Sequence, residues 1–162
     1  MSYENNAKPT LAQLQEHLGL DAAELKNIVL GHPAVLGYVP VNVFAKLRLQ
    51  QECLGLTDDE LRVAVIAQPM ALGYGKIKEK WALMMSDFAE EAGDQKLQAL
   101  RKLGFRGLGV GEPRLKRRLA DLKEAFGSAP KASEWFQRLV KDTDAQWAER
   151  LSQLPYRLNT SE

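Results

Sequence analysis

Hydrophobic and polar positions along the first half of the chain follow a helical spacing twice. In residues 21–31 apolar side chains recur at intervals of three and four, and residues 57–67 repeat this spacing. Apolar residues spaced in this way line one face of a helix. The pattern therefore predicts two amphipathic helices, whose apolar positions are Leu25, Ile28, Val29, Leu61, Ala64 and Val65.

Both predicted helices carry start and stop signals. Asp21 and Thr57 are each followed three residues later by a glutamate. This is typical of a capping box, in which two side chains bond the free amides of the first turn. Each helix is expected to end before a proline, Pro33 or Pro69, because the residue before proline is disfavoured in the helical conformation.

A short turn and a second helix follow each proline. The tripeptide Leu-Gly-Tyr at 36–38 and 72–74 is too short for an independent strand, so we expect a tight, 3₁₀-like turn that places leucine and tyrosine between helices. Second helices are then predicted over 41–53 and 76–89.

These segments are two copies of one unit with a period of 36 residues. Between positions 18 and 38, ten of 21 residues are identical to the residue 36 positions further on. A period in this range is the signature of a repeat array. Arrays stack their units along one axis and present a long surface to a partner, so the repeat favours binding over catalysis.

The same register continues more weakly on both sides. Leucines at equivalent positions indicate a third, degenerate unit over 93–126, with helices near 94–103 and 113–126. Thr10–Leu18 is expected to be the second helix of a truncated leading unit, with Thr10 as its cap.

Residues 128–130 break the register, and two short helices are predicted after them, over 133–140 and 144–154. They carry Trp135, Phe136 and Trp147, which we expect to close the apolar end of the stack. The alternative is an aromatic platform on which nucleic-acid bases stack.

We therefore expect an all-α helical-repeat superhelix, an αα-solenoid with short 3₁₀ elements. Its expected parts are a flexible N-terminus over 1–9, an array over 10–127 with repeats at about 18–53, 54–89 and 93–126, and C-terminal capping helices and tail over 128–162.

Composition narrows the class of protein. The chain has 162 residues, of which 45% are hydrophobic and 27% charged, as in ordinary globular domains. No apolar run approaches the length of a membrane span. Cys53 is the only cysteine, which excludes an intramolecular disulfide, and we expect it to be a small core side chain rather than a reactive thiol. The short, polar N-terminus shows no targeting segment.

The net charge of +1 conceals a basic centre. Residues 96–123 hold nine basic and two acidic side chains, for a net charge of +7, whereas residues 1–95 are net −5 and residues 124–162 net −1. Such asymmetry is typical of a site for a polyanion or an acidic partner.

The repeat resembles that of the mitochondrial transcription termination factor (mTERF) family. The resemblance rests on Leu-Gly-Leu with a following Glu-Leu, on Pro-x-x-Leu-Gly-Tyr, and on the amphipathic helix that comes next; it covers residues 18–89 well and 93–126 weakly. It implies a superhelix of two α-helices and a short 3₁₀ element per unit. It also implies a protein of mitochondria or chloroplasts that is no enzyme and that binds duplex DNA or RNA in transcription termination, intron processing or ribosome assembly.

The basic centre supplies the candidate contacts for a nucleic acid or an acidic partner. Leu115, Leu119, Leu122 and Phe126 mark the core face of the helix over 113–126, so its arginines and lysines are expected on the surface. Phosphate contacts by such side chains release counterions and make binding salt-dependent. The candidate residues are Arg101, Lys102, Arg106, Arg114, Lys116, Arg117, Arg118 and Lys123.

Other motifs carry no recognisable chemistry. The glycines of 104–111 match neither a Walker loop nor a dinucleotide fingerprint, and we interpret them as a helix stop and a decayed turn, with a loop that orders on a partner through Arg106 as the alternative. His17, His32 and one cysteine give no zinc spacing, so no metal or other cofactor is expected. No nucleophile has an identifiable base, which argues against an enzyme.

Two functions stay open. The resemblance favours an organellar protein that binds duplex DNA or RNA in gene expression. The near-neutral charge and the acidic first half favour the alternative, a structural or adaptor subunit of a large organellar assembly such as a ribosome or a membrane energy complex.

Overall fold

The computed structural model describes residues 3–154, which contain helices and no β-strand, so the predicted all-α class is confirmed. The ends of the predicted N-terminal segment and of the C-terminal tail, residues 1–2 and 155–162, lie outside the described residues. The chain divides into an N-terminal unit that ends at Ile77 and a C-terminal unit that begins at Lys78. This boundary falls inside the predicted repeat over 54–89.

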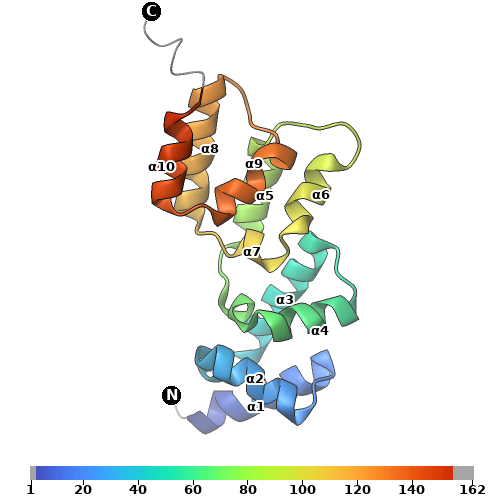
Figure 1. The fold of residues 1–162 in the computed structure, drawn as a ribbon. Helices are drawn as coiled ribbons and strands as arrows, with labels where there is room; N and C mark the ends of the chain where they lie inside the picture. The colour runs from blue at the N-terminus through green and yellow to red at the C-terminus, as the bar shows by residue number, and fades with distance from the viewer. Residues whose placement is uncertain (1–2, 155–162) are drawn as a thin grey trace, which may run out of the picture. The chain divides into compact units, whose positions relative to one another are not determined.

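The N-terminal unit begins with one helix, followed by a complete copy of the predicted helix–3₁₀–helix order. The first helix and the 3₁₀ helix of a second copy come next (Figure 1). Its elements are α1 (Tyr3–Leu18), α2 (Ala22–Gly31), η1 (Pro33–Gly37), α3 (Pro40–Leu54), α4 (Asp58–Ala67) and η2 (Pro69–Gly73). The equivalent helices α2 and α4 pack against each other, as expected for successive repeats.

The helix caps agree with the sequence at Thr57 and only in part at Asp21. The Thr57 hydroxyl accepts from the Glu60 amide at 3.2 Å, and the Glu60 carboxylate accepts from the Thr57 amide at 2.8 Å, which completes the capping box of α4. Asp21 accepts from the Glu24 amide at 2.8 Å, but its box is not reciprocal. The Glu24 carboxylate instead takes two 2.7 Å bonds from Arg62 of the next repeat, because the neighbouring helix offers it a charged donor.

A hydrogen bond closes the turn of each repeat. The Nε2 atom of His32 lies 2.6 Å from the Tyr38 hydroxyl, and Gln68 donates to the Tyr74 hydroxyl at the equivalent place 36 residues later. Each pair spans a 3₁₀ helix, so the residue before the proline and the tyrosine after the glycine fix the turn together. His32 is therefore a turn residue, as the sequence indicated.

Helix α1 begins at Tyr3, so the predicted flexible N-terminus is wrong for residues 3–9. Ala7, Thr10 and Leu14 are fully buried along one face of α1, which explains why the helix extends this far. Thr10 is no N-cap; its hydroxyl donates to the Tyr38 carbonyl at 2.8 Å. The bounds of α1 match those of α3 at the period of 36 residues to within one residue at the start.

The C-terminal unit continues the order of the repeat. Its elements are α5 (Ile77–Asp87, whose first residue belongs to the N-terminal unit), α6 (Gln95–Lys102), α7 (Phe105–Leu108), α8 (Glu112–Phe126), α9 (Ala132–Lys141) and α10 (Asp144–Ser152). Helices α6, α7 and α8 follow in the order predicted for the third unit, near the expected positions, with a short α-helix in place of the 3₁₀ turn.

The repeat is irregular at α5. Helix α3 buries Val43 and Leu47, and α8 buries the residues 72 positions on, Leu115 and Leu119. In α5 the buried side chains are Ile77, Lys80 and Met84, and Phe88 just after the helix continues this face, which is offset by about two positions from that of α3. The chain also enters α5 differently, since Lys76 has φ +52° where the equivalent Pro40 of α3 has its φ fixed near −65° by its ring.

Helices α9 and α10 bury Trp135, Phe136 and Trp147. Helix α9 packs against α6, and α10 lies beside α8 (Figure 1). Phe136 meets Phe88 edge to face with ring centroids 5.7 Å apart, and Trp135 meets Trp147 in the same manner at 6.4 Å. These rings form a core, so they are not exposed for base stacking as the aromatic-platform alternative requires.

Candidate binding surfaces

The basic residues at the end of α6 and in α7 are exposed. Arg101 and Lys102 form the last turn of α6, where cations interact favourably with the helix dipole. Arg106 lies on α7, one short turn further on. All three side chains reach solvent and can contact a ligand.

Helix α8 exposes four of the five candidates it carries, and each makes an ion pair. The distances are 3.5 Å from Arg114 and 3.4 Å from Arg117 to Asp144, 2.7 Å from Lys116 to Glu112, and 3.9 Å from Lys123 to Asp87. All four cations are exposed, and solvent screening keeps ion pairs of exposed side chains weak. A ligand phosphate can therefore compete with these carboxylates.

Arg118 differs from the expectation, because its side chain is 0% exposed. Its guanidinium donates to the Leu139 carbonyl at 2.6 Å and to Asp144 at 2.9 Å, and lies 5.0 Å from the centre of the Trp147 ring. It thus bonds a carbonyl near the C-terminal end of α9, where backbone acceptors have no partner within the helix. Arg118 is a structural residue and cannot present with its neighbours on the surface.

Asp144 is the acidic centre of the arginine cluster on α8. The hydrogen bond from Arg118 and then the charge of Arg114 hold the pKa of Asp144 below its ordinary 3.8. It also begins α10, where a carboxylate is favoured by the free amides of the first turn. Asp144 therefore neutralises part of the basic surface at physiological pH.

Two further cations of the C-terminal unit are buried and were not identified from the sequence. Lys96 donates to the carbonyls of Met85 and Phe88 at the end of α5 and to Glu90 at 2.8 Å. Lys80 donates to the Leu108 carbonyl, the last of α7, and burial lowers its pKa while Glu112 opposes the shift. The spacing Ile77, Lys80, Met84 was an available signal, since it places a lysine on an apolar helix face.

The glycine segment over 104–111 forms structure rather than a phosphate loop. Gly104 has φ +56°, a conformation that glycine adopts readily, and precedes α7. A Cβ atom at Gly107 would lie 3.0 Å from the Phe136 ring, so this glycine allows close packing of α9. The interpretation as a helix stop and a degenerate turn agrees with these positions.

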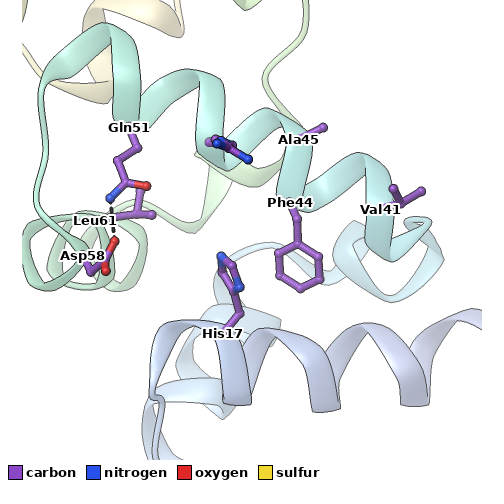
Figure 2. Close-up of a pocket in the computed structure, with 8 residues that line it drawn as sticks. His17, Val41, Phe44, Ala45, Gln51, Asp58 and Leu61 are labelled. Carbon is purple, nitrogen blue, oxygen red and sulfur yellow. Dashed lines mark hydrogen bonds between the residues drawn. The ribbon is translucent and has the colours of Figure 1, made fainter.

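A groove in the N-terminal unit is a second candidate surface, and the sequence did not indicate it. It has a volume of about 520 Å³ and runs between α1, α3 and α4, as Figure 2 shows. The His17 ring points from α1 towards Phe44 of α3, with ring centroids 4.7 Å apart. The lining residues are His17, Val41, Phe44, Ala45, Arg48, Gln51, Asp58 and Leu61.

Within residues 3–154 no three acidic, histidine or cysteine side chains are grouped as metal ligands would be. In the same part of the chain, no helix has the length and hydropathy to cross a membrane. Cys53 is half-buried near the end of α3. Neither a family model, nor a curated protein, nor a solved structure matches this chain.

Proposed function

We propose that this chain is a non-enzymatic nucleic-acid-binding protein, a short and divergent mTERF-like repeat protein that acts in organellar gene expression. The observation that carries the proposal is the group of seven exposed cations on α6, α7 and α8: Arg101, Lys102, Arg106, Arg114, Lys116, Arg117 and Lys123. Phosphates attract such groups irrespective of base sequence. On the resemblance of the repeat, we propose that the protein acts in mitochondria or chloroplasts.

The role of each exposed cation on α8 follows from its present partner. Arg114 and Arg117 share Asp144, so a phosphate can take the free face of either guanidinium while Arg118 keeps its hydrogen bond to that carboxylate. Lys116 pairs with Glu112, and Lys123 pairs with Asp87. The surface is therefore suited to charge-dependent binding.

The test is fluorescence anisotropy with labelled duplex DNA and duplex RNA at several salt concentrations. We expect binding that weakens steeply with salt, with a slope of about −0.9 per phosphate contact in a log–log plot for duplex DNA. The double variant R114A/R117A should bind more weakly and with a smaller slope. The control K26A/R48A removes two exposed charges from the N-terminal unit and should bind as the unchanged protein does. Absence of any complex at low salt would refute the proposal.

The adaptor alternative is favoured by the apolar side chains that the N-terminal unit exposes. Leu30, Val41, Val63 and Met70 are 58–69% exposed, more than the large apolar residues that the described part of the C-terminal unit leaves in solvent, Met85 and Phe126. If this function is the correct one, the native protein co-purifies with a defined particle after nuclease and high-salt treatment. Recovery as a free monomer would count against it.

A further inference from the structure

The groove shown in Figure 2 adjoins a second pocket. A second pocket of about 530 Å³ shares His17 and Phe44 with it and is also lined by Gln13 and Glu16 of α1. Both pockets therefore border the His17–Phe44 ring contact. Val41, 69% exposed, and Phe44 provide apolar surface along one wall, and Leu61 of α4 lies on another.

The wall supplied by α3 is a face that the repeat buries elsewhere. Val41, Phe44 and Arg48 correspond, 36 residues on, to Ile77, Lys80 and Met84 of α5. The α5 residues are no more than 5% exposed, whereas the Arg48 side chain is 81% exposed. The same helix face is thus buried in α5 and open to solvent in α3.

Helix α9 lies against the corresponding region of the C-terminal unit. It packs against α6, the equivalent of α4, and its Phe136 meets Phe88, which continues the buried face of α5 by one turn. Helix α9 thus contacts α6, the equivalent of the α4 wall, and it also contacts Phe88, the equivalent of Glu52, which follows the lining residue Gln51. It is amphipathic: Trp135, Phe136 and Leu139 are buried, and residues 131–141 carry a net charge of +2.

The charges around the groove complement such a helix. Glu16 and Asp58 line it and are exposed, and Asp59 follows on the first turn of α4. Arg48, the lining arginine, is paired with Glu52 at 3.3 Å, which offsets its charge. The rim is therefore net acidic and attracts a basic segment.

From these observations we propose that the groove between α1, α3 and α4 binds an amphipathic helix of a partner protein, with an aromatic or aliphatic anchor against Val41 and Phe44 and basic residues facing Glu16 and Asp58. A helix laid in an apolar groove by anchors one turn apart is a common mode of recognition. The inference goes beyond nucleic-acid binding and gives the adaptor alternative a defined surface.

The probe is a fluorescein-labelled peptide with the sequence of residues 131–141, the chain's own example of such a helix. It is titrated with the full chain and followed by anisotropy. We expect saturable binding that V41K weakens about tenfold or more, because the substitution removes an apolar contact and repels a basic ligand. V63K places the same charge on an exposed valine of α4 outside the lining and should change the affinity less than about twofold. E16Q should weaken binding mainly at low salt.

Equal effects of V41K and V63K would overturn the proposal, as would absence of binding at millimolar peptide or equal binding of a scrambled peptide. Displacement of the peptide by duplex DNA would overturn it by assigning the groove to nucleic acid. A dimer in sedimentation that V41K dissociates would overturn it by assigning the groove to a second copy of the chain. Because Val41 is mostly exposed, V41K should keep the melting temperature of the unchanged protein. Failure of duplex binding leaves this test unaffected.

Discussion

At the scale of single residues, Arg118 shows how a surface charge pattern conceals an internal contact. It lies one residue from Arg117, yet Arg118 is fully buried and the Arg117 side chain is 61% exposed. Its two bonds join α8 to the end of α9 and the start of α10. The same chemistry recurs at Lys80 and Lys96, which donate to carbonyls at the ends of α7 and α5.

Removing the Arg118 side chain should destabilise the protein far more than removing its neighbour. R118A leaves the buried Leu139 carbonyl without its donor, and an unsatisfied buried group costs about 1–3 kcal/mol. R117A loses only an exposed ion pair and should stay within about 0.5 kcal/mol. Urea unfolding of both variants measures the difference. Similar values for the two would show that Arg118 is not the structural contact described.

His32 is expected to make stability depend on pH. Burial lowers its pKa below the ordinary 6.5, so the folded protein binds this proton less readily than the unfolded chain. The contribution is therefore complete above pH 6.5 and is lost as the pH falls towards the lower folded-state pKa. H32Q should remove it, because glutamine keeps the bond to tyrosine, as Gln68 does at Tyr74.

The measurement is the free energy of unfolding of both proteins between about pH 8 and pH 5. The unchanged protein should lose more stability on acidification than H32Q, and the difference between the two curves isolates His32 from other titrating groups. Parallel curves would contradict the prediction.

At the scale of elements, small residues let successive repeats approach closely. A Cβ atom at Gly73 would lie 2.7 Å from the Tyr38 hydroxyl and 2.9 Å from Nε2 of His32, the hydrogen-bonded pair of the preceding repeat. At Gly31 it would lie 2.9 Å from the Pro69 ring. Gly37, the equivalent of Gly73 one repeat earlier, faces open space.

Gly73 and Gly37 allow a matched comparison, because they occupy equivalent positions and only at Gly73 would an added Cβ atom meet a neighbouring side chain. G73A should lower the free energy of unfolding by about 1–3 kcal/mol, because the added methyl group must displace a hydrogen-bonded pair. G37A should be neutral or slightly stabilising, since it restricts the unfolded chain without a clash. Thermal or urea unfolding of both variants tests the packing of the repeats. A neutral G73A would mean that the neighbouring turn moves aside freely.

At the scale of the whole molecule, the two compact units differ in charge and in the surface they offer. Residues 1–77 have a net charge of −2 and contain an apolar groove, whereas residues 78–162 have a net charge of +3 and expose basic side chains on α6, α7 and α8. The two surfaces differ chemically and therefore suit different partners. We expect a substitution on one surface to weaken the binding of that surface's partner alone.

A crossed comparison tests this division. R114A/R117A should lower the affinity for duplex nucleic acid and leave the affinity for the 131–141 peptide unchanged, and V41K should do the reverse. Anisotropy with both labelled ligands on the same preparations gives all four values. If one variant lowered both affinities, the two surfaces would not act separately.

Much of the secondary structure was predictable because its determinants are local. The capping residues, the prolines and the period of 36 residues placed the helices to within a few residues at most ends. Helix α1 was shortened in the prediction because Thr10 resembles a cap, whereas its hydroxyl bonds the Tyr38 carbonyl 28 residues away. The sequence did not predict that α5 buries a different face from α3. That change accompanies the positive φ of Lys76, which the pattern of apolar residues does not indicate.

The sequence by itself therefore determined the all-helical class, the order of elements within each repeat and the concentration of charge over 96–123. Only the tertiary structure decided which of those charges face solvent, because the carbonyl that buries Arg118 belongs to Leu139, 21 residues away along the chain. It alone formed the groove, whose walls come from three helices. Burial and concavity depend on which distant segments meet, whereas helix formation depends on neighbours within a few residues.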